Sequence, residues 1–279
     1  DARGLAELMI GSELPTPETR EDTVRPDVVF ALRGLTLHEG GRAVLDGVEV
    51  VVHAGEIVGI AGVEGNGQRE LLDVVIGVER ADGGVIELEG EDVTHLGTRH
   101  RREIGLGYIP EDRHHDGLVL DSPLWENVML GHQTRAPFVK GQWIDKEAAI
   151  ERTREIIAAF DVRTPGPEVA AVALSGGNQQ KLIIGREMMT EPKVLVAAHP
   201  TRGIDVGAQA AAWDAIRDAR AKGLGVLLIS ADLDELIGLS DSLLVIYKGR
   251  IVAHLDPAAT TPAELGSYMT GAMRANGAA

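Results

Sequence analysis

Short runs of apolar residues recur along the chain and are separated by polar stretches of turn and helix length. Runs of about four to eight apolar residues are typical of buried strands. They fall at residues 28–32, 48–53, 56–61, 85–89, 105–109, 194–197, 225–229, 243–247 and 251–254. The first three lie close together and predict an antiparallel β flank. The alternation of strands and helices in the rest predicts an α/β fold with a mainly parallel sheet.

Helical periodicity marks three longer segments between these runs. Residues 69–76 and 208–221 repeat apolar side chains at intervals of three or four positions, which gives each helix one apolar face. Residues 146–160 are strongly helical as well. They belong to a longer stretch, residues 123–161, in which no strand pattern occurs. We therefore expect residues 123–161 to form a helical insertion within the α/β core.

The N-terminal part of the chain differs in composition from the rest. Residues 11–27 are polar and rich in proline, which is typical of a linker. Residues 5–11 and 265–271 both fit the pattern Leu-x-x-[Leu/Tyr]-Met-x-Gly. We expect residues 1–10 to be the tail of a preceding homologous domain, and the parent protein to be a tandem repeat. The alternative is a chance match of a short pattern. The main domain is expected to occupy residues 28–279.

The composition argues against several classes of protein. The 279 residues include no cysteine, which excludes a disulfide framework and cysteine-ligated metals. No apolar stretch reaches the roughly 18 residues of a membrane span. The net charge is −16, and there are only three Phe, three Tyr and three Trp, so a nucleic-acid partner is not expected.

Two local charged clusters have simple interpretations. The basic run at residues 99–102 is expected on a solvated helix face, because the chain as a whole is strongly acidic. The cluster of His114, His115 and Asp116 is expected in an exposed polar turn rather than at a metal site.

A glycine-rich loop follows the run at residues 56–61 and leads into a helix. Its sequence is Gly62-Val63-Glu64-Gly65-Asn66-Gly67-Gln68-Arg69. Backbone N–H groups of such a loop, together with the helix N-terminus, can bind phosphate oxygens. Gly62 and Gly67 match the phosphate-loop template, whereas Gln68 and Arg69 occupy its lysine and hydroxyl positions. These residues alone leave two interpretations open, a phosphate-binding loop and a tight strand–helix turn without a ligand.

A second anion-binding pattern opens the helix that runs to about Met189. The segment Leu174-Ser175-Gly176-Gly177-Asn178-Gln179 places a hydroxyl and two glycine N–H groups at a helix start. This segment resembles the signature sequence of ABC-type ATPases. Other segments resemble the remaining motifs of that family in the required order: residues 108–111 the Q-loop, 194–201 the Walker B strand, 203–208 the D-loop and 228–233 the switch segment.

The resemblance to ABC-type ATPases extends over residues 28–271. Four segments also resemble one narrower group within that family. Residues 62–68, 110–113, 175–180 and 200–203 resemble the second ATPase domain of tandem importers for simple sugars and nucleosides.

This sequence departs from the family's pattern at the positions that hydrolyse ATP. A hydrolysing site uses a P-loop Lys on the phosphates, a Ser/Thr and an Asp for Mg²⁺, a Glu for the attacking water and a switch His. The aligned residues are here Gln68, Arg69, Ala198, His199 and Ala231, and Glu111 replaces the Q-loop glutamine. We therefore predict that the chain has no intact catalytic residue or metal site of its own and that, alone, it binds ATP weakly and hydrolyses it negligibly. The nucleotide-binding residues of this site would be Gly62, Glu64, Gly65, Asn66, Gly67, Gln68 and Arg69.

The resemblance implies an ABC-type P-loop NTPase fold with a helical subdomain at about residues 111–175. In ABC dimers, ATP lies between the P-loop of one domain and the signature segment of the other. The signature residues Ser175, Gly176, Gly177 and Gln179 would therefore complete the ATP and Mg²⁺ site of a partner. That partner would be the first nucleotide-binding domain of the same polypeptide, with Asp205 at the dimer seam.

The resemblance also implies partners outside this polypeptide. Transmembrane permease subunits would dock near Glu111 and the helical insertion, an extracytoplasmic solute-binding protein would act indirectly, and the domain would lie at the cytoplasmic face of the membrane. Two alternatives are a non-transport ABC ATPase, which acts on ribosomes or DNA, and a docking module that binds no nucleotide.

Overall fold

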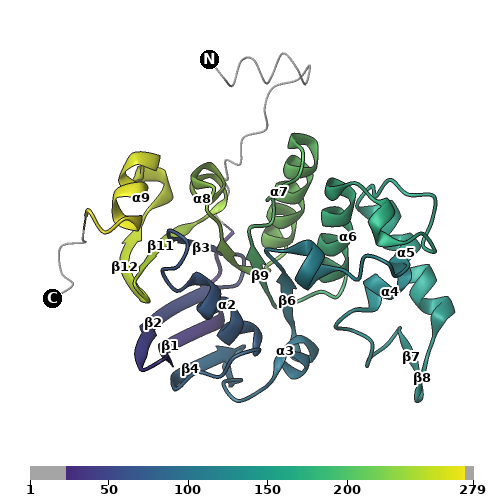
Figure 1. The fold of residues 1–279 in the computed structure, drawn as a ribbon, viewed down its shortest axis with the longest axis horizontal. Coiled ribbons are helices and arrows are strands. Elements are labelled where there is room, and N and C mark those ends of the chain that lie inside the picture. The colour runs from purple at the N-terminus through teal and green to yellow at the C-terminus, as the bar shows by residue number, and fades with distance from the viewer. Residues whose placement is uncertain (1–22, 274–279) are drawn as a thin grey trace, which may run out of the picture.

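The computed structural model describes residues 23–273 (Figure 1). The predicted tail at residues 1–10 and most of the predicted linker at residues 11–27 lie outside the described residues. The described end of that linker is bound to the main domain. Thr23 Oγ1 donates to the Gly55 carbonyl at 2.8 Å, and the Arg25 N–H donates to the Ala54 carbonyl at 2.9 Å.

The central element is a six-stranded sheet in the order β12-β11-β3-β10-β9-β6. Every neighbouring pair is parallel except β11 and β12, so the prediction of a mainly parallel sheet is confirmed. The strands are β3 (Ile57–Ala61), β6 (Leu106–Ile109), β9 (Val194–Ala198), β10 (Gly225–Ile229), β11 (Ser242–Tyr247) and β12 (Arg250–Leu255).

A second sheet packs against the first and is antiparallel throughout. Its order is β2-β1-β4-β5, formed by β1 (Val28–Glu39), β2 (Arg42–His53), β4 (Gly83–Leu88) and β5 (Glu91–Asp92). This sheet confirms the predicted antiparallel flank. It shares a hydrophobic core with one face of the main sheet.

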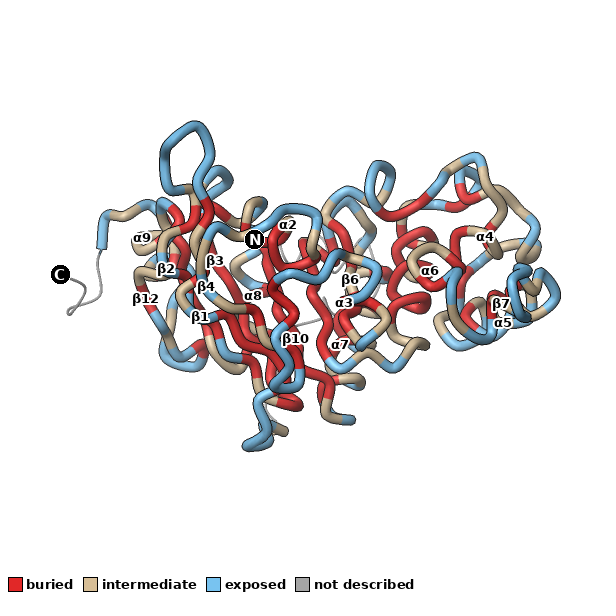
Figure 2. Tube along the Cα trace, turned by 90° about the horizontal axis from the view of Figure 1, so that it is seen from below, coloured by how far each residue is buried: buried red, intermediate tan, exposed pale blue. Residues whose placement is uncertain are grey.

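The inner strands β3, β9 and β10 are buried on both faces at every position, which explains why they are continuous apolar runs. In β10, Val226 and Leu228 face the core that contains the helices α6 to α9, whereas Leu227 and Ile229 face the core shared with α2 and the antiparallel sheet. Figure 2 shows these buried stretches in red. The helices around the main sheet are α2 (Gln68–Ile76), α3 (Thr98–Ile104), α6 (Gly176–Met188), α7 (Val206–Ala221), α8 (Leu233–Leu239) and α9 (Pro262–Met269).

The chain between β6 and α6 extends to one side of the sheet, next to α6 (Figure 1). It contains the π-helical turn η1 (Arg113–Gly117), the helices α4 (Leu124–Met129) and α5 (Lys146–Ala159), and the 3-10 turn η2 (Ala171–Ala173). The helices α4 and α5 agree with the predicted helical insertion at residues 123–161, but this stretch also contains a short hairpin, in which β7 (Val139–Lys140) pairs with β8 (Trp143–Ile144). Each of these strands has only two residues, so no periodic pattern can arise. The left-handed Gly141, with φ of 69°, makes the tight turn between them.

The basic run at residues 99–102 is a solvated helix face only in part: Arg99 and His100 are exposed as expected, whereas Arg101 and Arg102 are buried. Arg101 is 2% exposed and donates to the Val74 and Val75 carbonyls at the end of α2. Arg102 is also buried, and it pairs with Glu187 at 2.9 Å. A buried guanidinium is stable here because carbonyl and carboxylate oxygens surround it. His114, His115 and Asp116, in contrast, lie in the exposed turn η1 as expected.

Candidate functional site

The glycine-rich loop connects β3 directly to α2 and has the strand–loop–helix form that the sequence predicts. Gly65 and Gly67 have φ of 84° and 109°, in the left-handed region where a Cβ is unfavourable. Asn66 stabilises the loop, since its N–H donates to the Val63 carbonyl at 3.2 Å and its Oδ1 accepts from the Lys248 N–H at 3.0 Å. Backbone geometry alone therefore suits this loop for an anion at the start of α2.

The side chain of Gln68 folds back into this loop. Its Nε2 donates to the Val63 carbonyl at 3.1 Å, and a Cβ placed on Gly62 would lie 2.2 Å from the same nitrogen. The Gln68 Oε1 is buried without a hydrogen-bond partner. A neutral amide thus lies over Gly62, at the position where the P-loop template has an extended lysine.

Arg69, the next residue, forms ion pairs with carboxylates outside the loop. Its Nε donates to Asp73 Oδ2 at 3.2 Å, and its Nη2 lies 3.9 Å from Asp116 Oδ2. The hydrogen bond to Asp73 raises the pKa of Arg69 above its ordinary value, with Coulombic attraction as the next cause. The positive charge of Arg69 is therefore matched by acidic groups of the protein.

The end of β9 carries the next two residues of interest. Ala198 is completely buried, and its methyl group offers no oxygen to a metal ion. His199 follows in a left-handed conformation with φ of 46°, and its N–H donates to the Ile229 carbonyl at 2.7 Å. Burial lowers the pKa of His199, the nearby Glu111 opposes this shift and Arg202 adds to it. A neutral imidazole is the favoured form.

The Nδ1 atom of His199 accepts a hydrogen bond from the Ala231 N–H at 3.2 Å. The neutral ring then carries its proton on Nε2. One nitrogen is occupied and the other is already protonated, so neither is a free base for an attacking water. The structure thereby brings the predicted residues His199 and Ala231 into direct contact.

Gln68, Arg69 and His199 line one pocket of ≈ 910 Å³, whereas Asn66, Gly67 and Ala198 do not contribute to its lining. The pocket is lined from four segments: Gly62, Glu64, Gly65, Gln68 and Arg69; Glu111 to His114; His199 and Thr201 to Gly203; and Ile229 to Asp232, with Gln209. Glu111 is paired with Arg202 across this pocket. Within residues 23–273, no group of three or more His, Asp or Glu side chains is placed to hold a metal ion.

The signature segment lies next to this pocket, at the start of α6, and Ser175 is not among the pocket residues. Ser175 is the N-cap, exposed to solvent, and its Oγ accepts from Asn178 Nδ2 at 2.9 Å. Gly177 has no room for a side chain, because a Cβ would lie 2.8 Å from Ala208 Cβ and 3.0 Å from Asp205 Oδ2. Asp205 itself caps α7 by accepting from the Ala208 N–H at 3.0 Å. The structure thus places Asp205 beside the signature glycines.

Gln179 is buried, unlike the exposed Ser175. Its Nε2 donates to the Ala171 carbonyl at 3.1 Å, and its Oε1 lies 2.9 Å from His114 Nε2. Gln179 therefore holds α6 against its neighbours. Sequence reasoning missed the polar partners of this region, Arg113 and Arg202, although both lie in segments that carried the family resemblance. The sequence feature that could have pointed to them is the presence of an arginine inside each of these motifs.

Comparisons with known proteins identify the family of the chain. The protein-family model described as "ABC transporter" matches residues 45–202. The guanosine import ATP-binding protein NupO of Bacillus subtilis is 44% identical over 96% of this chain and 52% of its own length. The nucleoside import ATP-binding protein NupA of Lactococcus lactis is 41% identical over 96% of this chain and 53% of its own length. The chain thus spans about half the length of these curated relatives.

A solved structure supports the same fold. A nucleotide-free ATP-binding cassette from an ABC transporter superposes with a TM-score of 0.73 at 24% identity, covering 86% of this chain and 98% of the cassette. The predicted ABC-type P-loop NTPase fold is confirmed. No helix within residues 23–273 is both long enough and apolar enough to span a membrane. The ordered motifs, the matching family model and the shared fold together show that the chain belongs to the ABC transporter family.

Proposed function

We propose that this chain is the second nucleotide-binding domain of a tandem ATPase that drives import of nucleosides or simple sugars. Support comes from relatives that are named as guanosine and nucleoside import ATP-binding proteins and are about twice as long as this chain. The domain would bind transmembrane permease subunits at the cytoplasmic face of the membrane. An extracytoplasmic solute-binding protein would deliver the solute to those subunits.

We infer that the chain's own P-loop pocket binds Mg²⁺–ATP weakly and does not hydrolyse it. The observation that carries this inference is the amide of Gln68, which lies over Gly62 and brings no charge to a phosphate. Mg²⁺ prefers carboxylate and hydroxyl oxygens, whereas Ala198 ends β9 with a methyl group. Glu64 also lines the pocket and would repel a polyphosphate. The residues present do not fit a complete Mg²⁺–ATP site.

The signature segment supports a different role, which is to complete the ATP site of the preceding domain. Ser175 is exposed at the N-terminus of the 13-residue helix α6, and the backbone of Gly176 and Gly177 follows it. A hydroxyl, free N–H groups and the positive end of a helix dipole suit the terminal phosphate of a nucleotide held by another domain. When bound there, Mg²⁺–ATP would supply the hydrolytic chemistry, and this chain would contribute the Ser175 hydroxyl and the helix start.

Two measurements test this function. Labelled ATP is titrated onto the chain alone, and ATP hydrolysis is measured for the tandem protein with Ser175→Arg. The matched control is Ala158→Arg, which adds the same side chain to an exposed position of α5. We expect weak binding by the chain, loss of tandem hydrolysis in Ser175→Arg and normal hydrolysis in the control. Tight binding with turnover by the chain alone would refute the inactive P-loop site. Normal hydrolysis in Ser175→Arg would refute the shared site.

A further inference from the structure

A single buried side chain, Glu235 of α8, holds the chain on both sides of Asp205. Glu235 is completely buried, and α7 and α8 pack into the same core (Figure 1). Thr201 lies four positions before Asp205, and its Oγ1 donates to Glu235 Oε1 at 2.8 Å. Trp213 lies eight positions after Asp205, and its Nε1 donates to the same oxygen at 2.9 Å. One oxygen atom of α8 therefore fixes both ends of the segment that carries Asp205.

The other contacts of this segment differ in their exposure to solvent. Gln180 Nε2 of α6 donates to the Pro200 carbonyl at 2.7 Å in a buried position. Arg113 donates to the two carbonyls of residues 202–203 at 2.9 and 3.1 Å, but these contacts are exposed. Water replaces an exposed hydrogen bond at little cost, whereas a buried bond that is lost leaves its partner unsatisfied. We therefore expect the buried bonds to Glu235 to hold the segment more firmly than the exposed ones.

The surroundings of Glu235 favour a neutral carboxylic acid. Within residues 23–273, no Lys, Arg or His forms an ion pair with it, and its Oε2 is buried without a hydrogen-bond partner. An ionised carboxylate is unfavourable in such a place, because no cation compensates for the loss of water. Burial raises the pKa of Glu235, the polar groups of Ser230, Trp213 and Thr201 oppose this shift, and the negative charge of Asp232 adds to it.

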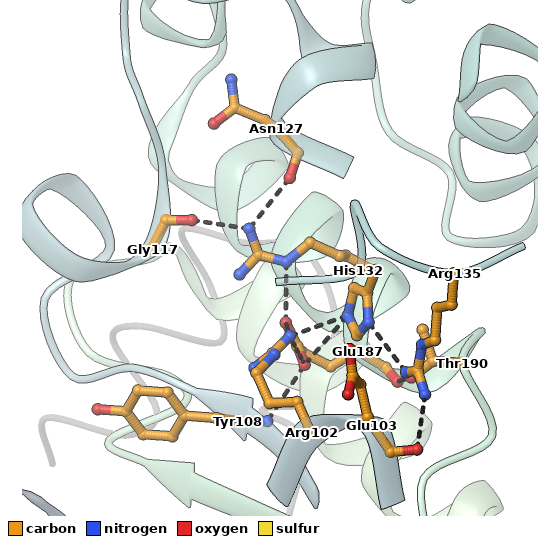
Figure 3. A network of polar contacts seen from close by, with 10 residues as sticks. Arg102, Glu103, Tyr108, Gly117, Asn127, His132, Arg135, Glu187 and Thr190 are labelled. Atoms are coloured by element: carbon orange, nitrogen blue, oxygen red, sulfur yellow. Dashed lines mark hydrogen bonds and ion pairs between the residues drawn. The ribbon is translucent and has the colours of Figure 1, made fainter. Parts of the chain in front are cut away.

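Glu187 of the same domain shows the opposite case. It is completely buried as well, but Arg102 and Arg186 donate to its carboxylate at 2.8 to 3.0 Å (Figure 3). Burial opposes ionisation of Glu187, but the two cations outweigh it and lower the pKa to about 2. The charge of a buried carboxyl group in this fold thus depends on whether a cation accompanies it. None accompanies Glu235 in the described part of the chain.

We propose that Glu235 is a positioning residue which, as a neutral carboxylic acid, joins α8 to Thr201 and Trp213 and so fixes the segment that presents Asp205. The neutral acid accepts both hydrogen bonds without placing a charge in the core. Its ionisation would bury an uncompensated charge at the point where the loop, α7 and α8 meet. This inference rests on the proposed function in one respect, namely that Asp205 lies at the seam with the partner domain.

The test uses the full 279-residue chain and compares two substitutions of Glu235. Glu235→Gln keeps an oxygen that accepts both hydrogen bonds and cannot ionise, so it imitates the neutral acid. Glu235→Ala removes the acceptor. The matched control is Asp234→Asn, which removes a carboxylate from the neighbouring, exposed position of α8. Circular dichroism confirms that each variant is folded.

The first measurement is urea unfolding at several pH values between 5 and 9. In the unfolded chain Glu235 loses its proton near its ordinary pKa of 4.5, whereas the folded chain keeps it. The contribution of the neutral acid to stability is therefore complete below pH 4.5 and decreases as the pH rises towards the folded pKa. Relative to Glu235→Gln, the unfolding constant of the parent should increase by up to about tenfold per pH unit. Asp234→Asn should follow the parent.

The second measurement is amide hydrogen exchange of residues 199–212, followed by mass spectrometry at pH 6. Glu235→Ala should raise the exchange rates of this segment by about tenfold, the ratio expected for the loss of one buried hydrogen bond. Glu235→Gln and Asp234→Asn should match the parent. Rescue by glutamine separates the positioning role of the acceptor oxygen from a general loss of packing.

A parallel pH dependence of the parent and Glu235→Gln would overturn the proposal, because Glu235 would then be ionised in the folded chain. Unchanged exchange in a folded Glu235→Ala chain would overturn it too. If Glu235→Ala does not fold, Thr201→Val carries the exchange test by the same criterion, since it removes one donor and keeps the shape of the side chain. All measurements use this chain alone, so their failure is separate from a failure of the shared ATP site, which the Ser175→Arg variant tests.

Discussion

Arg102, Arg186 and Glu187 form a buried ion network at the end of α6 (Figure 3). Replacing Glu187 by glutamine tests whether this network stabilises the fold. The substitution keeps the shape of the side chain and removes one negative charge. Arg102 and Arg186, which donate to that carboxylate at 2.8 to 3.0 Å, then keep their charges in a buried site without a counterion. Breaking a buried ion pair in this way costs about 3–5 kcal/mol, a large part of the ~5–15 kcal/mol by which domains are stable.

The same network predicts how stability depends on pH. Burial opposes ionisation of Glu187, but Arg102 and Arg186 attract the carboxylate and lower its pKa to about 2, from 4.5. A carboxyl whose pKa is lower in the folded state stabilises that state above the unfolded pKa, and the contribution is lost as the pH falls from 4.5 to 2. The difference amounts to about 3 kcal/mol. Glu187→Gln should lose this part of the acid sensitivity.

His132 lies beside the network and should cause a second decrease in the free energy of unfolding, at higher pH. Burial lowers the pKa of His132 from 6.5 to about 3, so the folded protein holds it neutral while the unfolded chain protonates it. Its contribution is complete above pH 6.5 and decreases as the pH falls towards 3, by about 2 kcal/mol at pH 5. This step should persist in Glu187→Gln and disappear in His132→Gln.

Urea unfolding followed by circular dichroism, at several pH values between 7 and 3, provides the measurement. A midpoint that shifts with an unchanged m-value reports a change in stability. The control is Glu155→Gln, an exposed carboxylate that pairs with Arg152 on α5, for which we expect a change below about 1 kcal/mol. If Glu187→Gln is as stable as the control, or keeps the full acid sensitivity, the ion network does not stabilise the fold as argued.

Four further substitutions are tested by urea unfolding, three of them around the signature helix and α7 and one in α9. Gly177→Ala should cost about 1–3 kcal/mol, because the new methyl group would lie 2.8 Å from a side chain of α7. Gly266→Ala, with open space around it in α9, should instead stabilise by about 0.5–1 kcal/mol, and equal effects of the two would contradict this reasoning. Asp205→Ala removes the N-cap of α7 and should cost about 0.5–2 kcal/mol; no loss would show that the cap is dispensable. Trp213→Phe deletes the indole donor to the buried Glu235 at 2.9 Å and should cost about 1–3 kcal/mol, and an unchanged midpoint would refute this value.

The main sheet was predictable because each buried strand is a short run of apolar residues that is visible in the local sequence. A strand buried on both faces must be apolar at every position, and residues 225–229 satisfy this rule and form β10 with the predicted ends. The hairpin of β7 and β8 was missed because two-residue strands have no period to detect. Its exposed Trp143, at 81%, also lacks the apolar environment that marks a strand position.

The buried ion network could not be predicted from the local sequence. Arg101 and Arg102 belong to a run of basic residues, and such a run in isolation is typical of a solvated helix surface. Arg102 can be buried because it pairs with the carboxylate of Glu187, which lies 85 positions later in the chain. Arg101 is buried because the carbonyls at the end of α2 need donors. Neither partner can be inferred until the fold brings α2, α3 and α6 together.

The candidate site shows the same limit at the level of single side chains. The sequence revealed that Gln68, His199 and Glu111 differ from the family's pattern, but not what these side chains contact. Each has acquired a partner within the protein: Gln68 donates to the Val63 carbonyl, His199 accepts from the Ala231 N–H, and Glu111 pairs with Arg202.

Buried and half-buried polar groups are stable when they are hydrogen-bonded, and each of these three side chains has one such contact within the protein, although the Gln68 Oε1 has no partner. Replacing Gln68 would leave the Val63 carbonyl with its two donors from Asn66, and replacing Glu111 would free an arginine side chain that is 64% exposed to water. The three contacts have separate partners, so we expect substitutions at these positions to act independently on stability.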